Sequence, residues 1–363
     1  YKTHNKKTFK GILIILKKYT FIFIRILLLN ILSIFSKLKN YKNLNLKKDY
    51  DIAIIFPKND NWVLSGISHD LASQLNQRGL NTLEIPSNKL KESYRAKKLL
   101  FIQHELALKL TYKNPSLLDK SCVYISHLRT ISLSDVEQLC KFNFIFCQSS
   151  KDQMRLYTLG ILPGRVIHLP IGFDQNLFFN KVDIKERKYD FLISTPLKIE
   201  ALGSHYWHRK SSVLIEELIL ELSNRGYRIL AIGKGWEKSL LRNNKSIKIV
   251  NPEYKNKNKY LNQCKVFLNL SLLEGGPVTV VEALASGCAV ISKDNGLAVD
   301  LSLDFPKSFF IIPNIFNKII LAKYISKIFK KYTSNSFKIE REVLIKKYSF
   351  KFLSGIIHKN INI

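Results

Sequence analysis

The chain has 363 residues and 46% of them are hydrophobic, so it is long enough to form two domains that each bury a core. Its 58 lysines and arginines outnumber 28 aspartates and glutamates, which gives a formal charge of +30. This excess favours anionic partners such as nucleic acid, phosphate-bearing ligands or an anionic membrane surface. The lysines are spread along the chain and often stand beside asparagine, as in residues 255–259, so a compositional bias explains much of the charge. No signature of a DNA- or RNA-binding module is present, and we expect no nucleic-acid partner.

Residues 1–48 combine long apolar runs with regularly placed cations. Lys17, Lys18 and Arg25 interrupt these runs, so no uncharged stretch approaches the roughly 20 residues that a spanning helix needs. On a helix, the basic residues fall on one side, which is typical of a basic amphipathic helix lying on an anionic membrane surface. The alternative is a helix docked on the protein's own core. No small-residue cleavage site follows, which argues against a signal peptide.

The cysteines carry no metal-binding or disulfide signature. None of the five belongs to a CxxC pair, and most stand in apolar runs. We therefore expect reduced thiols buried in the core, as in a cytoplasmic protein.

Residues 49–184 alternate short apolar runs with helical patterns, which favours an α/β domain built on a parallel sheet. A loop with Ser65 and Gly66 leads to a helix at 68–78, which Gly79 ends. This resembles a Rossmann-like opening, although a full GxGxxG is absent. The expected strands are 51–56, 81–85, 99–103, 123–126, 144–147 and 166–169.

The same pattern restarts in residues 185–345, after a charged stretch at 180–188 that we take as the domain boundary. Two doubly wound sheets in series place a crevice between their carboxyl edges, where nucleotide ligands usually bind. Residues 346–363 form a C-terminal tail that we expect to pack back on the first domain. The expected strands are 189–194, 228–232, 247–250, 266–270 and 289–291, with a helix at 211–222.

One segment of the second domain, SLLEGGPVTVVEALASGCAVI (271–291), has the pattern of a phosphate site. Pro277 suits the first turn of a helix, so the amides of Val278, Thr279 and Val280 are predicted to be unpaired donors at its positive end. Two glycines before the proline, Gly275 and Gly276, would let a phosphate approach the backbone closely.

Two carboxylates, Glu274 and Glu282, interrupt this apolar segment. Burying a carboxylate without a partner costs several kcal/mol or more, so each either pairs with the chain or waits for a ligand. Glu282 would lie about one turn into the helix, within reach of a sugar hydroxyl beside a bound phosphate. We predict that both acids face the crevice, are not neutralised by the chain's own basic side chains, and accept hydrogen bonds from a nucleotide-sugar.

The pattern S-x-x-E-G-x-P-x-x-x-x-E-A-x-A-x-G-x-x-V at 271–290 resembles the donor-site signature of family 4 (group 1) retaining glycosyltransferases, which have the GT-B fold. The resemblance covers about residues 50–350. It implies an acceptor-binding domain at 49–184 that faces a donor-binding domain at 185–345 across a central cleft. Further matching segments, in order, are the helix at 68–79, Val123–His127, Ser149–Asp174 and His208–Lys210.

The resemblance also implies roles for the matching residues. Lys210, with Arg209, would neutralise the donor diphosphate and stabilise it as a leaving group. Glu282 would hold the ribose hydroxyls, Glu274 would contact the transferred sugar, and His127 would lie near the reacting centre. The implied catalytic residues are His127, Glu274 and Lys210, and the implied donor-binding residues are Arg209, Lys210, Gly275, Gly276, Pro277, Val278, Thr279, Glu282 and Gly66.

The family pattern is incomplete at two positions. The usual arginine about five residues before the lysine is absent, and either Lys198 or Arg209 substitutes for it. The glycine loop of the first domain is reduced to Ser65 and Gly66. Because basic residues replace a metal as the diphosphate clamp, no metal cofactor is expected, and the one DxD, at 49–51, is predicted to be structural.

The implied activity is transfer of a sugar, with retention of anomeric configuration, from a nucleotide-diphosphate-sugar to a lipid-linked or polysaccharide acceptor. The enzyme would be cytoplasmic and peripheral at the inner face of the membrane. Two alternatives stay open: a GT-B enzyme resembling UDP-sugar 2-epimerases, and a non-catalytic basic protein that binds membranes or nucleic acid.

Overall fold

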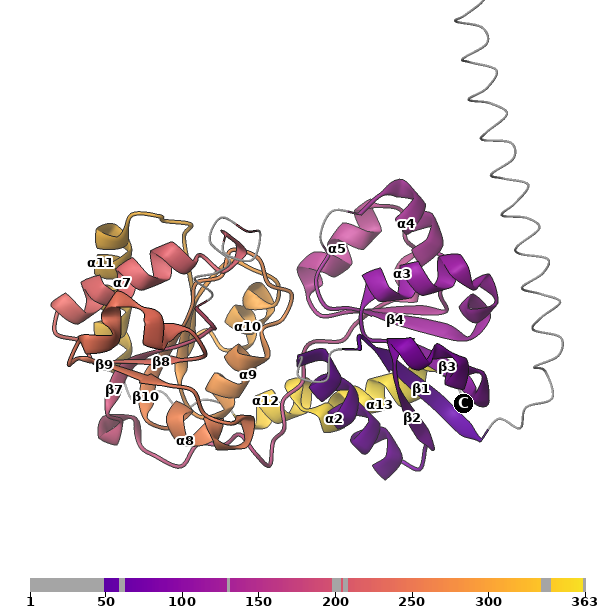
Figure 1. Cartoon of the computed structure of the whole chain (residues 1–363), viewed down its shortest axis with the longest axis horizontal. Helices are drawn as coiled ribbons and strands as arrows, with labels where there is room; N and C mark the ends of the chain where they lie inside the picture. The colour runs from indigo at the N-terminus through magenta and orange to yellow at the C-terminus, as the bar shows by residue number, and fades with distance from the viewer. Residues whose placement is uncertain are drawn as a thin grey trace, which may run out of the picture.

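The computed structural model describes residues 49–58, 63–128, 131–197, 204, 208–333 and 341–361. The predicted membrane-associating helix of residues 1–48 lies outside this part of the chain, as does Lys198. The described residues form two α/β domains that lie side by side along the long axis of the molecule (Figure 1).

The first domain contains a six-stranded parallel sheet with the order β2-β1-β3-β4-β5-β6. All six strands overlap the predicted apolar runs, although β3 begins three residues before the predicted one, and most of their side chains are buried because helices cover both faces. The elements are β1 (Tyr50–Phe56), α2 (Val63–Gln77), β2 (Thr82–Pro86), β3 (Ala96–Phe101), α3 (His104–Lys113), β4 (Ser121–Ile125), α4 (Leu133–Leu139), β5 (Phe144–Cys147), α5 (Ser150–Thr158) and β6 (Val166–His168).

The second domain repeats this architecture with the order β12-β11-β10-β7-β8-β9. The edge strand β12 was not predicted, although its sequence Phe-Phe-Ile-Ile is a short apolar run. The elements are β7 (Tyr189–Ser194), α7 (Ser212–Asn224), β8 (Ile229–Ile232), β9 (Ile247–Val250), α8 (Lys257–Leu261), β10 (Cys264–Asn269), α9 (Val278–Ala285), β11 (Ala289–Lys293), α10 (Ala298–Asp304), β12 (Phe309–Ile312) and α11 (Lys318–Thr333).

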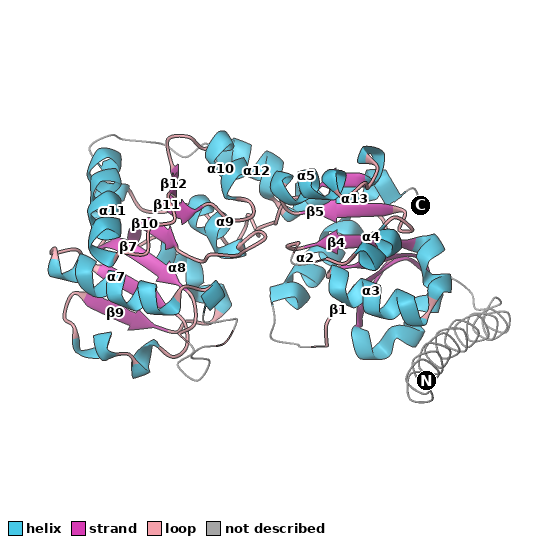
Figure 2. Ribbon diagram, turned by 90° about the horizontal axis from the view of Figure 1, so that it is seen from above, coloured by secondary structure: helices cyan, strands magenta, loops and turns pink. Residues whose placement is uncertain are grey.

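Two parallel-sheet Rossmann-like domains confirm the predicted α/β fold class. In Figure 2, helices lie on both sides of each sheet, as a doubly wound sheet requires. One prediction about local structure is wrong: Gly66 lies in the first turn of α2 and not in a loop before it. The helix begins earlier than expected because Leu64 and Ile67 already bury apolar side chains on its inner face.

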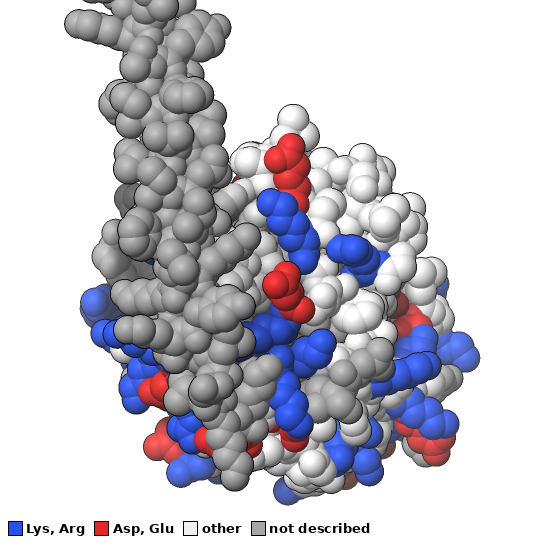
Figure 3. Space-filling model, turned by 90° about the vertical axis from the view of Figure 1, so that its right-hand side faces the viewer, with Lys and Arg blue, Asp and Glu red and all other residues white. Residues whose placement is uncertain are grey.

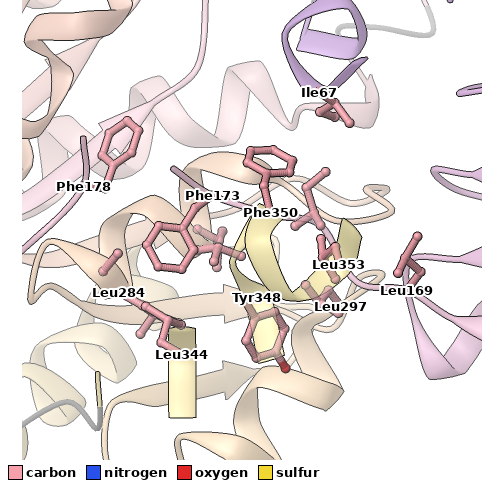
Figure 4. Packing of buried hydrophobic residues seen from close by; sticks show 14 of the residues in the cluster. Ile67, Leu169, Phe173, Phe178, Leu284, Leu297, Leu344, Tyr348, Phe350 and Leu353 are labelled. Atoms are coloured by element: carbon pink, nitrogen blue, oxygen red, sulfur yellow. The ribbon is translucent and has the colours of Figure 1, made fainter. Parts of the chain in front are cut away.

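The chain passes between the domains twice, and the two crossings pack together. The last helices are α12 (Arg341–Tyr348) and α13 (Phe350–Ile361), and α13 packs on α2 of the first domain. The amide of Phe173 donates to the carbonyl of Tyr348 at 2.9 Å, and the ring of Phe350 covers Gly172 so closely that a Cβ there would lie 2.5 Å from it. Figure 4 shows Phe173, Phe350 and Tyr348 gathered between the two domains.

These crossings are part of a hydrophobic core that continues from one domain to the other. The cluster includes Ile54 and Leu71 of the first domain and Phe267 and Leu284 of the second. Separate clusters fill the outer face of each sheet. The continuous core and the paired crossings hold the two carboxyl edges of the sheets against each other.

Figure 3 shows how charged side chains are distributed on one face of the molecule. On the face in Figure 3, basic side chains are interspersed with acidic ones and do not form one continuous patch. No described helix is both long enough and apolar enough to traverse a bilayer. None of the five cysteines forms a disulfide, and only Cys140 is not fully buried, as predicted for core thiols.

Candidate active site

The predicted strand–loop–helix corner is present. β10 ends at Asn269, Pro277 caps the helix, and α9 runs from Val278 to Ala285. One detail is wrong: the amide of Val280 is not unpaired, because it donates to the carbonyl of Pro277 at 2.9 Å in a tight first turn. The amides of Val278 and Thr279 have no partner among the described residues, so two donors remain at the positive end of α9.

Glu274 forms a compact cluster with the two basic residues that the motif predicts. Arg209 Nη1 lies 3.0 Å from Glu274 Oε2, and Lys210 Nζ contacts Oε1 of the same carboxylate. All three side chains are more than four-fifths buried. Ser211, which follows them, adopts the left-handed conformation (φ 54°) that non-glycine residues rarely take, and it turns the chain into α7.

Burial and pairing act in opposite directions on the pKa values of this cluster. Burial raises the pKa of Glu274, but Lys210 and Arg209 together outweigh burial and hold that pKa below its usual value. Burial lowers the pKa of Lys210, and Glu274 offsets only part of this effect. Among the described residues of the cluster, two basic side chains contact one carboxylate.

Glu282 is completely buried and is held by two residues that the sequence did not single out. Tyr254 Oη donates to Glu282 Oε1 at 2.7 Å, and Lys257 Nζ donates to Oε2 at 2.6 Å. Lys257 Nζ also donates to Thr279 Oγ1 at 3.1 Å. Burial and the neighbouring carboxylate raise the pKa of Tyr254, so its hydroxyl stays protonated and acts as the donor.

The prediction that the chain does not neutralise Glu274 and Glu282 is therefore wrong. Each acid is paired because an unpaired carboxylate at this depth would lose its hydration without compensation. The argument from two unpaired acids cannot by itself identify the site. What the described residues retain for a ligand is an excess of basic over acidic side chains around Glu274.

The two glycines of the corner were predicted to let a phosphate approach the backbone, but in the structure they face residues of the first domain. A Cβ on Gly275 would lie 1.3 Å from the carbonyl oxygen of Ser126 and 2.8 Å from the Cβ of His127, both in the first domain. A Cβ on Gly276 would lie 2.8 Å from Gln148 Oε1. These glycines let the two domains touch, and the contact places His127 beside the Glu274 loop.

A cavity of about 280 Å³ lies between the domains next to this contact. Its lining on the first domain includes Gly66, which thus reaches the site from a helix instead of a loop. Asp70, one turn further along α2, also lines the cavity, and burial together with Asp174 raises its pKa to about 6. From the second domain, the lining includes Tyr254, Lys257, Val278, Thr279 and Glu282.

The structure thus brings all the predicted site residues to the junction of the domains, in two adjoining groups. The first contains His127, Arg209, Lys210, Glu274, Gly275 and Gly276; the second contains Gly66, Val278, Thr279 and Glu282, with Pro277 between them. The DxD lies elsewhere: Asp49 pairs with Arg95 and Asp51 with Lys97 at the start of β1.

Sequence reasoning missed Lys257, Tyr254, Asp70 and Gln148. Lys257 stands in the Lys/Asn-rich run that composition explained. Helical spacing could have identified Lys257. Leu261, four residues later, is fully buried, and residues four apart lie on the same face of a helix, so Lys257 also faces inward.

Comparisons with known proteins agree with this geometry. Residues 197–314, which include both basic residues and both glutamates, match the family model described as "Glycosyl transferases group 1". The chain is similar to the crystal structure of HepE from Anabaena in complex with UDP and glucose (TM-score 0.64, 10% identity, 86% of this chain and 99% of that chain). No curated protein sequence matches the chain.

Two further structures extend the likeness. Sucrose-phosphate synthase from Thermosynechococcus elongatus aligns with a TM-score of 0.66 and 14% identity, over 85% of this chain and 98% of that chain. WaaG, described as a glycosyltransferase involved in lipopolysaccharide biosynthesis, aligns with a TM-score of 0.59 and 12% identity, over 86% and 99%. At such identities these structures show the fold, and the family match is confined to residues 197–314. The chain has the GT-B fold of these structures, and its residues 197–314 resemble a group 1 glycosyltransferase domain.

Proposed function

We propose that the enzyme transfers a sugar from a nucleotide-diphosphate-sugar, with retention of anomeric configuration and without a metal, to a lipid-linked or polysaccharide acceptor. The observation that carries the donor proposal is the cluster of Arg209, Lys210 and Glu274, in which two basic side chains contact one carboxylate, beside the start of α9. HepE has been crystallised with UDP-glucose, and its fold is the one described above.

The geometry supports a division of labour. A diphosphate would compete with Glu274 for Lys210 and Arg209 and accept from the amides of Val278 and Thr279, which stabilises the charge that develops as the sugar leaves. Glu274, released from part of its pairing, would accept from hydroxyls of the sugar. Because side-chain cations and amides do this, no metal ion is needed at the diphosphate.

His127 would act from the first domain. Its ring is oriented by Ser126, whose Oγ lies 3.1 Å from His127 Nδ1, and its Cβ abuts the Gly275 loop. This position supports the proposal that the histidine lies near the point where a sugar held by Glu274 would meet an acceptor from the first domain.

A thermal-shift panel of UDP-, GDP- and ADP-sugars tests the donor proposal. At a ligand concentration 100 times Kd, preferential binding adds about 2.7 kcal/mol to the free energy of unfolding. We expect one nucleotide class to raise Tm, with no change on addition of EDTA. Lys210→Met and Glu282→Ala should lose this shift.

Lys238→Met, at an exposed lysine of the same domain, is the control and should keep the shift. Absence of any shift with the wild-type protein would contradict the proposal. Conversion of a UDP-sugar to its epimer without an acceptor would favour the epimerase alternative, and steep salt-dependent DNA binding without nucleotide binding would favour a non-catalytic protein.

We further propose that residues 1–48 hold the enzyme at an anionic membrane surface, where a lipid-linked acceptor would be available. The support is the sequence pattern of that segment. Deleting residues 1–45 should abolish sedimentation with anionic liposomes while leaving the nucleotide-induced thermal shift unchanged. Equal liposome binding with and without the segment would contradict this proposal.

A further inference from the structure

Lys257 differs from the other lysines of its run. Its side chain is only 14% exposed, whereas that of Lys255 is 75% exposed and pairs with Glu253 at the surface. Lys257 opens α8 and extends inward to Glu282 and Thr279. The ammonium group of a lysine loses much of its hydration at such a position. Hydrogen bonds from the protein or a ligand must therefore replace the lost contacts with water.

Lys257 and Glu282 each retain hydrogen-bonding positions that their present partners do not use. An ammonium group has three donors, and Lys257 uses two of them, on Glu282 and Thr279. A carboxylate has about four accepting positions, and Glu282 receives one donor at each oxygen, from Tyr254 and Lys257. Lys257 can therefore donate to one further anionic oxygen, and Glu282, which is completely buried, would accept from a ligand hydroxyl once the Tyr254 hydroxyl moves aside.

The cavity beside the pair has an unusual charge balance. Its lining contains two carboxylates, Asp70 and Glu282, and Lys257 is the one basic side chain among the described residues that line it. Arg209 and Lys210 are held at Glu274 and do not line it. A phosphate that entered here would meet two negative charges, so the ammonium of Lys257 decides whether the cavity admits it.

We propose that Lys257 is a further donor-binding residue, which contacts the phosphate adjoining the ribose while Glu282 holds the ribose hydroxyls. The unused donor and the unused acceptors of the pair match a sugar 5′-phosphate, which offers anionic oxygens and a diol on one small ring. The hydrogen bond to Thr279 would hold the ammonium group of Lys257 where it can contact both the phosphate and Glu282. The inference rests on the proposed function and adds a third cation to the predicted diphosphate clamp.

Binding measurements on a matched set of variants test this inference. The probes are the nucleoside diphosphate, of UDP, GDP and ADP, that stabilises the wild-type protein most, and the corresponding nucleoside, measured by competition. We expect Lys257→Met to weaken diphosphate binding at least tenfold and nucleoside binding less than threefold. Lys257→Arg should restore most of the diphosphate affinity.

Two variants separate phosphate contact from simple support of Glu282. In a Glu282→Gln background, which removes the buried negative charge, Lys257→Met should still weaken diphosphate binding by a similar factor. This double variant also leaves no unpaired buried charge, so it keeps the test open where Lys257→Met alone does not fold. Lys259→Met, two residues along on the exposed side of α8, should match the wild type.

The outcomes are distinct. Equal weakening of nucleoside and diphosphate would mean that Lys257 only positions Glu282, and unchanged diphosphate affinity would mean that it does not contact the phosphate; either result overturns the inference and leaves the proposed function intact. A wild-type protein that binds none of the three diphosphates would overturn both.

Discussion

At the scale of single residues, the two glutamates of the site differ in the charge and in the hydrogen-bonding positions of the side chains around them. Glu274 contacts two basic side chains, so basic groups outnumber acidic ones in its cluster. Glu282 has one cation and one phenol hydroxyl, so its group is neutral and rich in hydrogen-bonding positions. The first environment suits a leaving diphosphate and the second suits a neutral diol with a single phosphate beside it.

Asp70 gives a pH-dependent prediction. Its folded-state pKa of about 6 lies above the ordinary 3.8, so ionisation of Asp70 opposes folding. The stability that it contributes is complete below pH 4 and is lost as the pH rises through 6. Asp70→Asn removes this charge. After allowance for solvent screening of a half-buried group, we expect it to raise the free energy of unfolding by about 1–2 kcal/mol at pH 8 and by nearly nothing at pH 4.

Urea denaturation at both pH values measures this difference. Asp119→Asn, at an exposed aspartate of the same domain, serves as the control and should show no pH-dependent gain. A gain at pH 4 as large as that at pH 8 would contradict the assigned burial of the Asp70 carboxyl.

At the scale of elements, the corner between β10 and α9 joins the two domains. Gly275 touches the backbone of Ser126, and a Cβ on Gly296, in the loop before α10, would lie 1.7 Å from the carbonyl oxygen of Gly275. The corner is thus held between the first domain and a neighbouring loop of its own domain. Close packing on both sides fixes Glu274 relative to His127.

Gly275→Ala tests the importance of this contact. The added methyl group overlaps Ser126 O, so the domains must separate, and a displacement of about 1 Å between reacting groups can lower a rate by about 10²-fold. We expect a loss of kcat of this order, with a smaller change in nucleotide affinity because the proposed donor contacts lie mostly within the second domain.

Transfer assays under saturating donor measure the change in kcat. Gly164→Ala is a suitable control, since nothing lies within 4 Å of a Cβ at that position. Wild-type kcat in Gly275→Ala would mean that the interdomain contact at the corner does not position the catalytic groups.

Most strands and helices could be predicted from local patterns in the sequence. Strands such as Phe144–Cys147 and Ile247–Val250 are short apolar runs between turn residues, and the structure has them at those bounds. The hydrogen bonding of the first turn of α9 was harder to predict. Whether the Val280 amide donates to the Pro277 carbonyl depends on the local dihedral angles and not on residue type. The start of α2 was missed for a similar reason, since Gly66 lowers helix propensity but does not prevent a helix.

At the scale of the whole molecule, the important contacts join residues far apart in the chain. Gly275 meets Ser126, Phe350 covers Gly172, and the Asp300 carboxylate accepts from the Ser150 amide at the start of α5 at 3.2 Å. Such contacts leave no periodic signal in the sequence. The motif therefore predicted a candidate site, whereas the pairing of its acids and the contacts of its glycines required the structure.

The central claim is that the junction of the two domains binds a nucleoside diphosphate through Lys210, the start of α9 and Glu282. A crystal structure of the protein with the diphosphate that stabilises it most tests this directly. We predict phosphate oxygens within hydrogen-bonding distance of Lys210 Nζ and of the Val278 or Thr279 amide, with ribose hydroxyls on Glu282. A nucleotide bound elsewhere, with the pairs of Glu274 and Glu282 unchanged, would contradict the account.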